Sequence, residues 1–272
     1  MHKQNIPGKF GTMRLFNCLF LLVSMFLISC EKDPLNNCDC TLTTKGLLCK
    51  TYFFEYNECI GYVDYAYNNK LQRQTESFKT VKGKLKKVIA STYNDQGNII
   101  ETYVDIKSPA KTEKTTFTYN ASNRIDKIEQ FENEKLIKNK LFFYNESGQL
   151  EKSKIYNLGI SDSIILYEYD TKGLLWRESS LNGDSIVSSY KIHLFYDNNI
   201  ERVNLYNSNN AYLGYNLQIF NTMGNIISYL TYSRTNELTE KITYEYENNL
   251  LIKESKLNGF NQLISYTAHF YS

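Results

Sequence analysis

The stretch Tyr144–Leu150 (YNESGQL) decides the fold of this chain. An aromatic residue is followed by Asn, two variable residues, Gly, one variable residue and an aliphatic residue. The same pattern recurs in Tyr93–Ile99, Tyr119–Ile125, Tyr169–Leu175 and Phe220–Ile226. The position four past the aromatic residue is Gly or Asn in all five stretches. These residues best tolerate the positive φ that a type I turn with a bulge requires, so the pattern predicts a tight hairpin.

The aromatic residue of this pattern returns along the chain at a steady interval. It stands at Tyr67, Tyr93, Tyr119, Tyr144, Tyr169, Tyr196, Phe220, Tyr246 and Tyr271, at spacings of 24 to 27 residues. Such a period indicates one structural unit copied about eight times. Three units have a shorter form, Tyr67–Leu71, Tyr196–Ile200 and Tyr246–Leu250, in which an Asn-Asn pair predicts a two-residue type I′ turn.

The segments on either side of each turn have the pattern of β-strands. Aromatic and aliphatic residues alternate with polar ones, as in Thr116–Tyr119 and Thr243–Tyr246. Second turns are predicted between units at Asn182-Gly183, Asn258-Gly259, Leu158-Gly159 and Ser108-Pro109. We therefore expect an all-β fold over residues 46–272: an extended antiparallel meander of about 16–18 short strands, built from hairpin repeats of about 25 residues. Because wide sheets twist, this sheet should curl into a spiral or barrel-like roll.

The N-terminus has the features of an export signal. Arg14 precedes an apolar run, Leu15–Ile28, which is shorter than the roughly 20 residues of a spanning helix. The sequence Leu27–Cys30 (LISC) resembles the lipobox of bacterial lipoproteins. That resemblance implies a lipoprotein signal peptide at 1–29, lipidation of Cys30 with acyl chains such as palmitate, and a short tether over 30–45. The alternative is an uncleaved anchor with an incidental Cys.

A lipidated Cys30 would make the membrane a partner through the lipid anchor, since two or three acyl chains hold a protein durably on a bilayer. Acidic residues directly after Cys30 resemble export signals of some outer-membrane lipoproteins. The expected localisation is the outer membrane, at the cell surface or on the periplasmic face.

Four cysteines follow Cys30, and all are close to the N-terminus: Cys38, Cys40, Cys49 and Cys59. An even number in an exported chain predicts two disulfide bonds. Cys38 and Cys40 are too close to pair easily with each other, so each is expected to pair with Cys49 or Cys59. The alternative is a zinc site, but the spacing has only one short Cys pair and no His nearby.

Charge and motifs exclude several classes of function. Removal of residues 1–29 takes away Lys3, Lys9 and Arg14, which leaves 28 basic and 29 acidic residues, so no nucleic-acid partner is expected. No catalytic, metal-binding or phosphate-binding motif is present, and no cofactor is expected. The mature histidines, His193 and His269, lie in strand patterns and are interpreted as structural or exposed. We therefore expect a protein that is not an enzyme, although abundant carboxylates keep a glycan hydrolase open.

Three residues remain as candidate surface sites. Trp176, the only Trp, lies just after a turn and outside the repeated positions, so it is a candidate ligand contact. Ser163 and Ser185 each lie in an Asp-Ser-Ile sequence that resembles an O-glycan acceptor of some Gram-negative bacteria. The alternative interpretation is that three-residue matches arise by chance.

The repeat units Tyr144–Leu150 and Tyr169–Leu175 resemble the YD repeats of the rearrangement-hotspot (RHS) family over about residues 60–272. The usual Tyr-Asp is here mostly Tyr-Asn or Tyr-Glu. The resemblance implies hairpins joined into one long curled sheet, and a surface or adhesion role.

Three functions remain open at this level. The first is a membrane-anchored envelope lipoprotein that serves as a non-catalytic binding or adhesion scaffold for glycan or protein. The second is a structural or assembly subunit of an envelope complex. The third is a glycan hydrolase.

Overall fold

The computed structural model describes residues 46–157, 160–183, 185–196 and 199–271, and the described residues form strands and turns without helices. The 18 strands are β1 (Leu48–Glu55), β2 (Glu58–Tyr67), β3 (Arg73–Lys79), β4 (Leu85–Tyr93), β5 (Ile99–Lys107), β6 (Ala110–Tyr119), β7 (Ile125–Glu132), β8 (Lys135–Tyr144), β9 (Leu150–Asn157), β10 (Ile160–Tyr169), β11 (Leu175–Leu181), β12 (Val187–Tyr196), β13 (Ile200–Asn207), β14 (Tyr212–Phe220), β15 (Ile226–Ser233), β16 (Leu238–Glu247), β17 (Leu250–Asn258) and β18 (Leu263–Tyr271). The all-β prediction and the predicted strand number are confirmed. Within these ranges, no helix has the length and apolar character needed to cross a bilayer.

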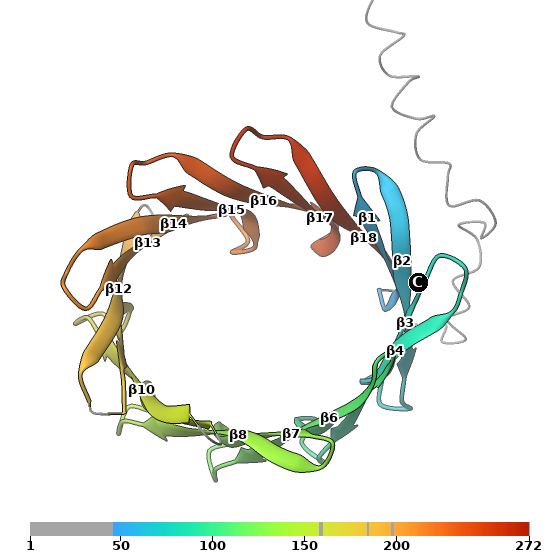
Figure 1. Ribbon diagram of the computed structural model, residues 1–272, viewed down its shortest axis with the longest axis horizontal. Helices are drawn as coiled ribbons and strands as arrows, with labels where there is room; N and C mark the ends of the chain where they lie inside the picture. The colour runs from blue at the N-terminus through green and yellow to red at the C-terminus, as the bar shows by residue number, and fades with distance from the viewer. Residues whose placement is uncertain (1–45, 158–159, 184, 197–198, 272) are drawn as a thin grey trace, which may run out of the picture. The chain divides into compact units, whose positions relative to one another are not determined.

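The strands form one closed antiparallel barrel. Each strand pairs with the next along the chain, and β18 pairs with β1, so no strand is left as an edge. Figure 1 shows the ring, with the first strands beside the last. An even number of strands is required here, because only then does the last strand of a meander run antiparallel to the first. The sequence prediction of a curled sheet is confirmed, and the structure shows that it closes.

The turn after the repeat aromatic has the predicted geometry. The positive-φ position is Gly97, Asn123, Gly148, Gly173 and Gly224 in the five long-form units. In the first of these, the amide of Gly97 donates to the carbonyl of Asn94, and the Asn94 amide donates to the carbonyl of Asn98. The Asn94 side chain also accepts from the Asn98 amide. The Asn or Asp after each aromatic residue is therefore a capping residue of the turn.

The short-form turns divide into three cases. Asn248 and Asn249 both have positive φ, so the predicted type I′ turn is confirmed in the Tyr246 unit. The prediction is wrong for Tyr67–Leu71: Leu71 takes the positive φ, and the Asn68 carbonyl accepts from its amide, as in the long form. The Asn68 side chain accepts from two amides at once, and this stabilises the longer turn. The third turn, in Tyr196–Ile200, includes residues outside the described ranges.

The turns at the other end of the barrel use the same chemistry. The turns predicted at Asn182-Gly183 and Asn258-Gly259 are confirmed, but the positive φ falls on Ser185 and Asn261 rather than on the glycines. Asn182 and Asn258 cap these turns through their side chains. Pro109 lies in the connection between β5 and β6, as predicted. Leu158-Gly159 lies outside the described residues.

A β-bulge follows the turn in most units. Tyr93 is opposite Ile99 and Thr92 is opposite Glu101, so Ile100 has no partner across the hairpin. The unpaired position is Gln74, Ile100, Asp126, Glu151, Trp176, Ile227 or Ile252 in successive bulged units. A bulge interrupts the ladder of backbone hydrogen bonds and increases the local twist.

The repeat tyrosines connect each unit to the previous one at this bulge. The hydroxyl of Tyr144 donates to the carbonyl of Ile125 at 2.8 Å, and that of Tyr169 donates to Leu150 at 2.9 Å. In each case the acceptor is the residue opposite the previous repeat aromatic. The same bond is made by Tyr67, Tyr93, Tyr119, Tyr246 and Tyr271. The tyrosine ladder is therefore a structural network rather than a free row of stacking platforms.

The cross-strand register assigns side chains to two faces of the wall. We call the face that carries Tyr67 and Tyr93 the tyrosine face, and the other the opposite face. Charged residues stand on both: Glu76, Lys87, Glu113 and Lys140 on the tyrosine face, and Asp64, Lys79, Asp105 and Lys114 on the opposite face. Neither face is therefore a continuous apolar surface around the barrel.

The barrel wall has little conventional core. Among the described residues, only Cys49, Val63 and Val203 are buried hydrophobic side chains. Stability must come from the closed hydrogen-bond ladder and from cross-strand pairs such as Tyr215–Tyr232, whose ring centroids are 4.5 Å apart. Each such pair contributes roughly 0.2–1 kcal/mol.

We expect Tyr144→Phe to lower the free energy of unfolding by about 1 kcal/mol, because the substitution removes one hydrogen bond and leaves the Ile125 carbonyl without that donor. Urea denaturation followed by circular dichroism would measure the change. Tyr103→Phe is the control, since Tyr103 is 42% exposed and its hydroxyl bonds to no described residue. Equal changes in the free energy of unfolding from the two substitutions would show that the tyrosine hydrogen bonds do not stabilise the barrel.

Candidate functional site

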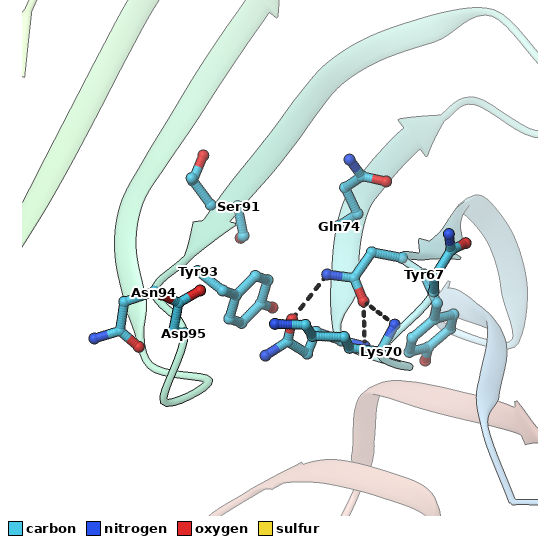
Figure 2. Close-up of a pocket in the computed structure, with 11 residues that line it drawn as sticks. Tyr67, Lys70, Gln74, Ser91, Tyr93, Asn94 and Asp95 are labelled. Carbon is cyan, nitrogen blue, oxygen red and sulfur yellow. Dashed lines mark hydrogen bonds between the residues drawn. The ribbon is translucent and has the colours of Figure 1, made fainter.

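The main candidate site is a groove between two neighbouring hairpins, β2–β3 and β4–β5. Its volume is about 560 Å³. Figure 2 shows Tyr93 pointing from β4 toward the β2–β3 turn, where Lys70 and Tyr67 lie. The lining residues are Tyr67, Asn68, Asn69, Lys70, Gln72, Gln74, Ser91, Thr92, Tyr93, Asn94 and Asp95. All are polar or carry a hydroxyl, so the groove offers hydrogen-bonding groups and two tyrosine rings.

The groove exists because one repeated position has a small residue in this unit. Two residues before the repeat aromatic, on the same face, other units carry Tyr65, Phe117, Phe142, Tyr167 or Tyr244. The Tyr93 unit has Ser91 there. A hydroxymethyl group in place of an aromatic ring leaves the space above the wall unfilled. Gln74, the bulge residue of the previous unit, lines the same space.

Several lining groups already have partners, and others do not. The hydroxyls of Tyr67 and Tyr93 donate to backbone carbonyls, and the Asn68 amide donates to Gln72 at 2.8 Å. By contrast, the side chains of several lining residues make no hydrogen bond or ion pair within the described part of the chain: Asn69, Lys70, Gln74, Thr92 and Asp95. These groups are available to a polar ligand.

A second cluster lies on the tyrosine face of β11, β12 and β13. Nδ1 of His193 is 2.7 Å from Glu201 Oε1, and Nε2 is 3.3 Å from Glu178 Oε1 without hydrogen-bond alignment. Lys191 also pairs with Glu178, at 3.1 Å. The His193 side chain is only 9% exposed. His193, which was predicted to be structural or exposed, is therefore a largely buried bridge between two carboxylates.

The electrostatics of this cluster favour a charged imidazole. Burial alone would lower the pKa of His193, but Glu178 and Glu201 outweigh it and raise the pKa to about 9. In return, His193, with Lys191, lowers the pKa of Glu178 to about 2. His193 and its partners therefore form an ion-pair clamp across three strands rather than an acid–base pair poised near neutral pH.

His269 has the opposite character. Its Nδ1 is 3.0 Å from Thr51 Oγ1, which also accepts a hydrogen bond from Tyr65. Burial, helped by the charge of Arg73, lowers the pKa of His269, so its imidazole is neutral at neutral pH. This chain of hydrogen bonds joins β18, β1 and β2 at the place where the barrel closes.

The remaining predicted site residues do not gather at either cluster. Trp176 is 36% exposed and occupies the bulge position that follows the turn, and its role as a ligand contact stays a prediction. The Arg177 guanidinium lies 6.0 Å from its ring. Ser185 lies in the exposed β11–β12 turn, whereas Ser163 lies inside β10, opposite Ile155. Their glycosylation stays a prediction.

The described cysteines follow the predicted pairing only in part. Cys59 is a free thiol, so its assignment to a disulfide is wrong. It lies in β2, where its sulfur contacts the carbonyl of Gly61. Cys49 is disulfide-bonded, and its partner lies outside the described residues. Cys30, Cys38 and Cys40 also lie outside them. Among the described residues, no group of three His, Cys, Asp or Glu side chains is arranged to hold a metal ion.

Comparison with known proteins gives no family. No family model and no curated protein matches the sequence. Similar solved structures include porin-like proteins from Bacteroides uniformis (10% identity, TM-score 0.47, 84% of this chain and 99% of that one) and Bacteroides vulgatus (7%, 0.33, 83% and 98%). A DUF1329 family protein from Desulfovibrio piger is also similar (8%, 0.24, 82% and 81%). All three TM-scores are below 0.5, so these likenesses carry no argument about function.

We expect the contribution of the His193 clamp to the free energy of unfolding to fall at alkaline pH. The pKa of His193 is about 6.5 in the unfolded chain and about 9 in the folded protein. The stabilisation is therefore complete below pH 6.5 and is lost as the pH rises through 9. The loss should be on the order of 1–3 kcal/mol. Urea midpoints measured from pH 6 to 9.5 would show it.

His193→Gln should remove the fall in the free energy of unfolding between pH 6.5 and 9, whether or not the variant is less stable at neutral pH. His269→Gln is the matched control, because the lowered pKa of His269 affects stability only as pH falls below about 6.5. A wild-type alkaline slope that persists in His193→Gln would contradict the assignment.

Proposed function

We propose that this protein is a lipid-anchored cell-envelope protein that binds glycan, without chemical conversion, in the groove beside Ser91. The observation that carries the proposal is the lining of that groove. Amide, hydroxyl and tyrosine side chains face one open space, and several of the polar groups have no partner within the described chain. Glycans are recognised by this combination of many hydrogen bonds and a few aromatic rings.

The carboxylates of the groove support binding over hydrolysis. Glycoside hydrolases with a carboxylate mechanism need two acidic residues on either side of the scissile bond. Among the described residues that line the groove, Asp95 is the one acidic residue. The two glutamates beside His193 lie instead in an ion-pair cluster with that histidine.

The anchoring part of the proposal rests on the resemblance of Leu27–Cys30 to a lipobox. Lipidation at Cys30 would hold the barrel at the membrane through the tether over 30–45, and charge on both faces of the wall suits a barrel surrounded by water. The outer membrane, with the barrel at the cell surface or on the periplasmic face, is the proposed location. The YD-repeat resemblance agrees with a surface role.

An assembly role is the second candidate, and an apolar surface favours it. On the opposite face of β12, Val187, Tyr190, Ile192, Leu194 and Tyr196 follow one another without a charge. Leu194 and Tyr196 are 36% and 46% exposed. A surface of this kind suits contact with another envelope protein.

We expect Cys30→Ser to move the protein from the membrane fraction to the soluble fraction, because the acyl chains attach only to the cysteine thiol and the new amine. Fractionation with immunoblotting would measure this, together with the mass of the mature protein. Cys59→Ser is the control and should leave the distribution unchanged. Retention of the Cys30 variant in the membrane fraction would contradict a lipid anchor.

We expect Ser91→Phe to abolish glycan binding without unfolding the barrel. The substitution restores an aromatic ring that Phe117 and Phe142 provide in other units, so it fills the groove with a side chain the fold accepts. Glycan-array screening would find a ligand, and titration calorimetry should show at least a tenfold loss of affinity, about 1.4 kcal/mol.

Ser208→Phe, in the exposed β13–β14 turn, is the matched control for an added aromatic ring. If the variant at position 91 binds as well as the wild type, the groove is not the glycan site. If the wild type binds no glycan and co-purifies with one envelope protein through the β12 surface, the assembly role replaces the proposal.

A further inference from the structure

A second hollow opens in the wall at β16, β17 and β18, and its chemistry differs from that of the groove. Its volume is about 440 Å³. Among its lining residues, Leu250, Ile252 and Phe270 are apolar, and Glu245 and Glu247 are acidic. It therefore combines an apolar floor with carboxylates, whereas the groove beside Ser91 is polar throughout.

A small residue at a repeated position borders this hollow. Three residues before the repeat aromatic, on the opposite face, three units carry a leucine (Leu141, Leu166 and Leu217), and others carry shorter residues such as Ala90 and Thr116. The last unit has Ala268, whose cross-strand neighbours are Tyr52 on β1 and Lys253 on β17. The missing three carbons leave space between these neighbours.

An aromatic pair holds one side of the hollow in place. The rings of Tyr52 and Phe270 meet edge to face, with centroids 5.4 Å apart and planes at 87°. Phe270 lines the hollow directly. The pair joins β1 to β18 at the barrel closure, so this side of the site belongs to the hydrogen-bonded wall rather than to a loop.

The charged side chains around the hollow give it a net negative charge. Glu245 pairs with Lys253 at 3.2 Å, but Glu247 is exposed and forms no ion pair within the described part of the chain. His269, which also lines the hollow, is held by Thr51. With two carboxylates and one ammonium group, the site has a net charge of about −1 near neutral pH.

We propose that this hollow is a second binding site, which takes a cationic group carried on an apolar stem. The apolar floor and Phe270 accept the stem, and Glu247 pairs with the cation at the rim. The aromatic ring attracts a nearby cation through a cation–π interaction, and the carboxylate attracts it through a charge-assisted hydrogen bond. The site is independent of the glycan groove, since the two share no lining residue.

Three probes of equal length and different charge test the proposal: pentylamine, 1-pentanol and pentanoate at pH 7. Their dissociation constants for the full chain are measured by NMR titration of the amides of β16 to β18. We expect pentylamine, which is cationic at this pH, to bind at least fivefold more tightly than pentanol, and pentanoate to bind most weakly.

Two variants separate the floor from the charge. Ala268→Leu, which restores the side chain of other units, should abolish binding of pentylamine and pentanol alike. Glu247→Gln should bring their affinities within twofold of each other. Glu237→Gln, in the exposed β15–β16 turn, is the control and should keep the fivefold preference.

Equal affinities for the three probes in the wild type, or a fivefold preference that survives Glu247→Gln, would overturn the proposal. The exposed Glu247 variant keeps the test decisive even if Ala268→Leu disturbs the closure. Ser91→Phe should leave pentylamine binding unchanged, so failure of the glycan proposal and failure of this one give different results.

Discussion

The barrel depends on the hydrogen bond that seven repeat tyrosines donate to the bulge of the preceding unit. A bulge adds one residue to one strand only, so it bends the strand and interrupts the ladder. The hydroxyl of Tyr144 supplies a donor to the carbonyl at the bulge of the preceding unit. The Tyr196 unit shows the converse: its hairpin has no bulge, its ring lies on the opposite face, and it is 46% exposed.

A wall stabilised in this way leaves many side chains free to vary. Most of its stability comes from backbone pairing, from turns capped by Asn or Asp, and from the tyrosine bonds, while few apolar side chains are fully buried. A change of size at one repeated position therefore opens a site without disrupting the fold. Ser91 and Ala268 are small residues at two repeated positions, one on each face of the wall, and they border sites of opposite chemistry.

The sequence predicted the strands and most turns because those features depend on local residues. It could not place His193 between Glu178 and Glu201, since the three residues lie on three separate strands and meet only through the register of β11, β12 and β13. It also assigned Cys59 to a disulfide from the count of cysteines alone. The groove could have been found by comparing the residues two positions before each repeat aromatic, among which Ser91 is the smallest.

By itself, the sequence determined the hairpin unit, its period and its all-β character, because alternation, turn residues and their spacing act over fewer than ten residues. Only the tertiary structure decided that the sheet closes, with β18 pairing to β1 over more than two hundred residues of chain. Closure depends on the total twist that successive bulges contribute around the wall, and the sequence of one unit does not reveal this total. The same holds for the sites, because each is built from strands whose side chains meet only when the register is set.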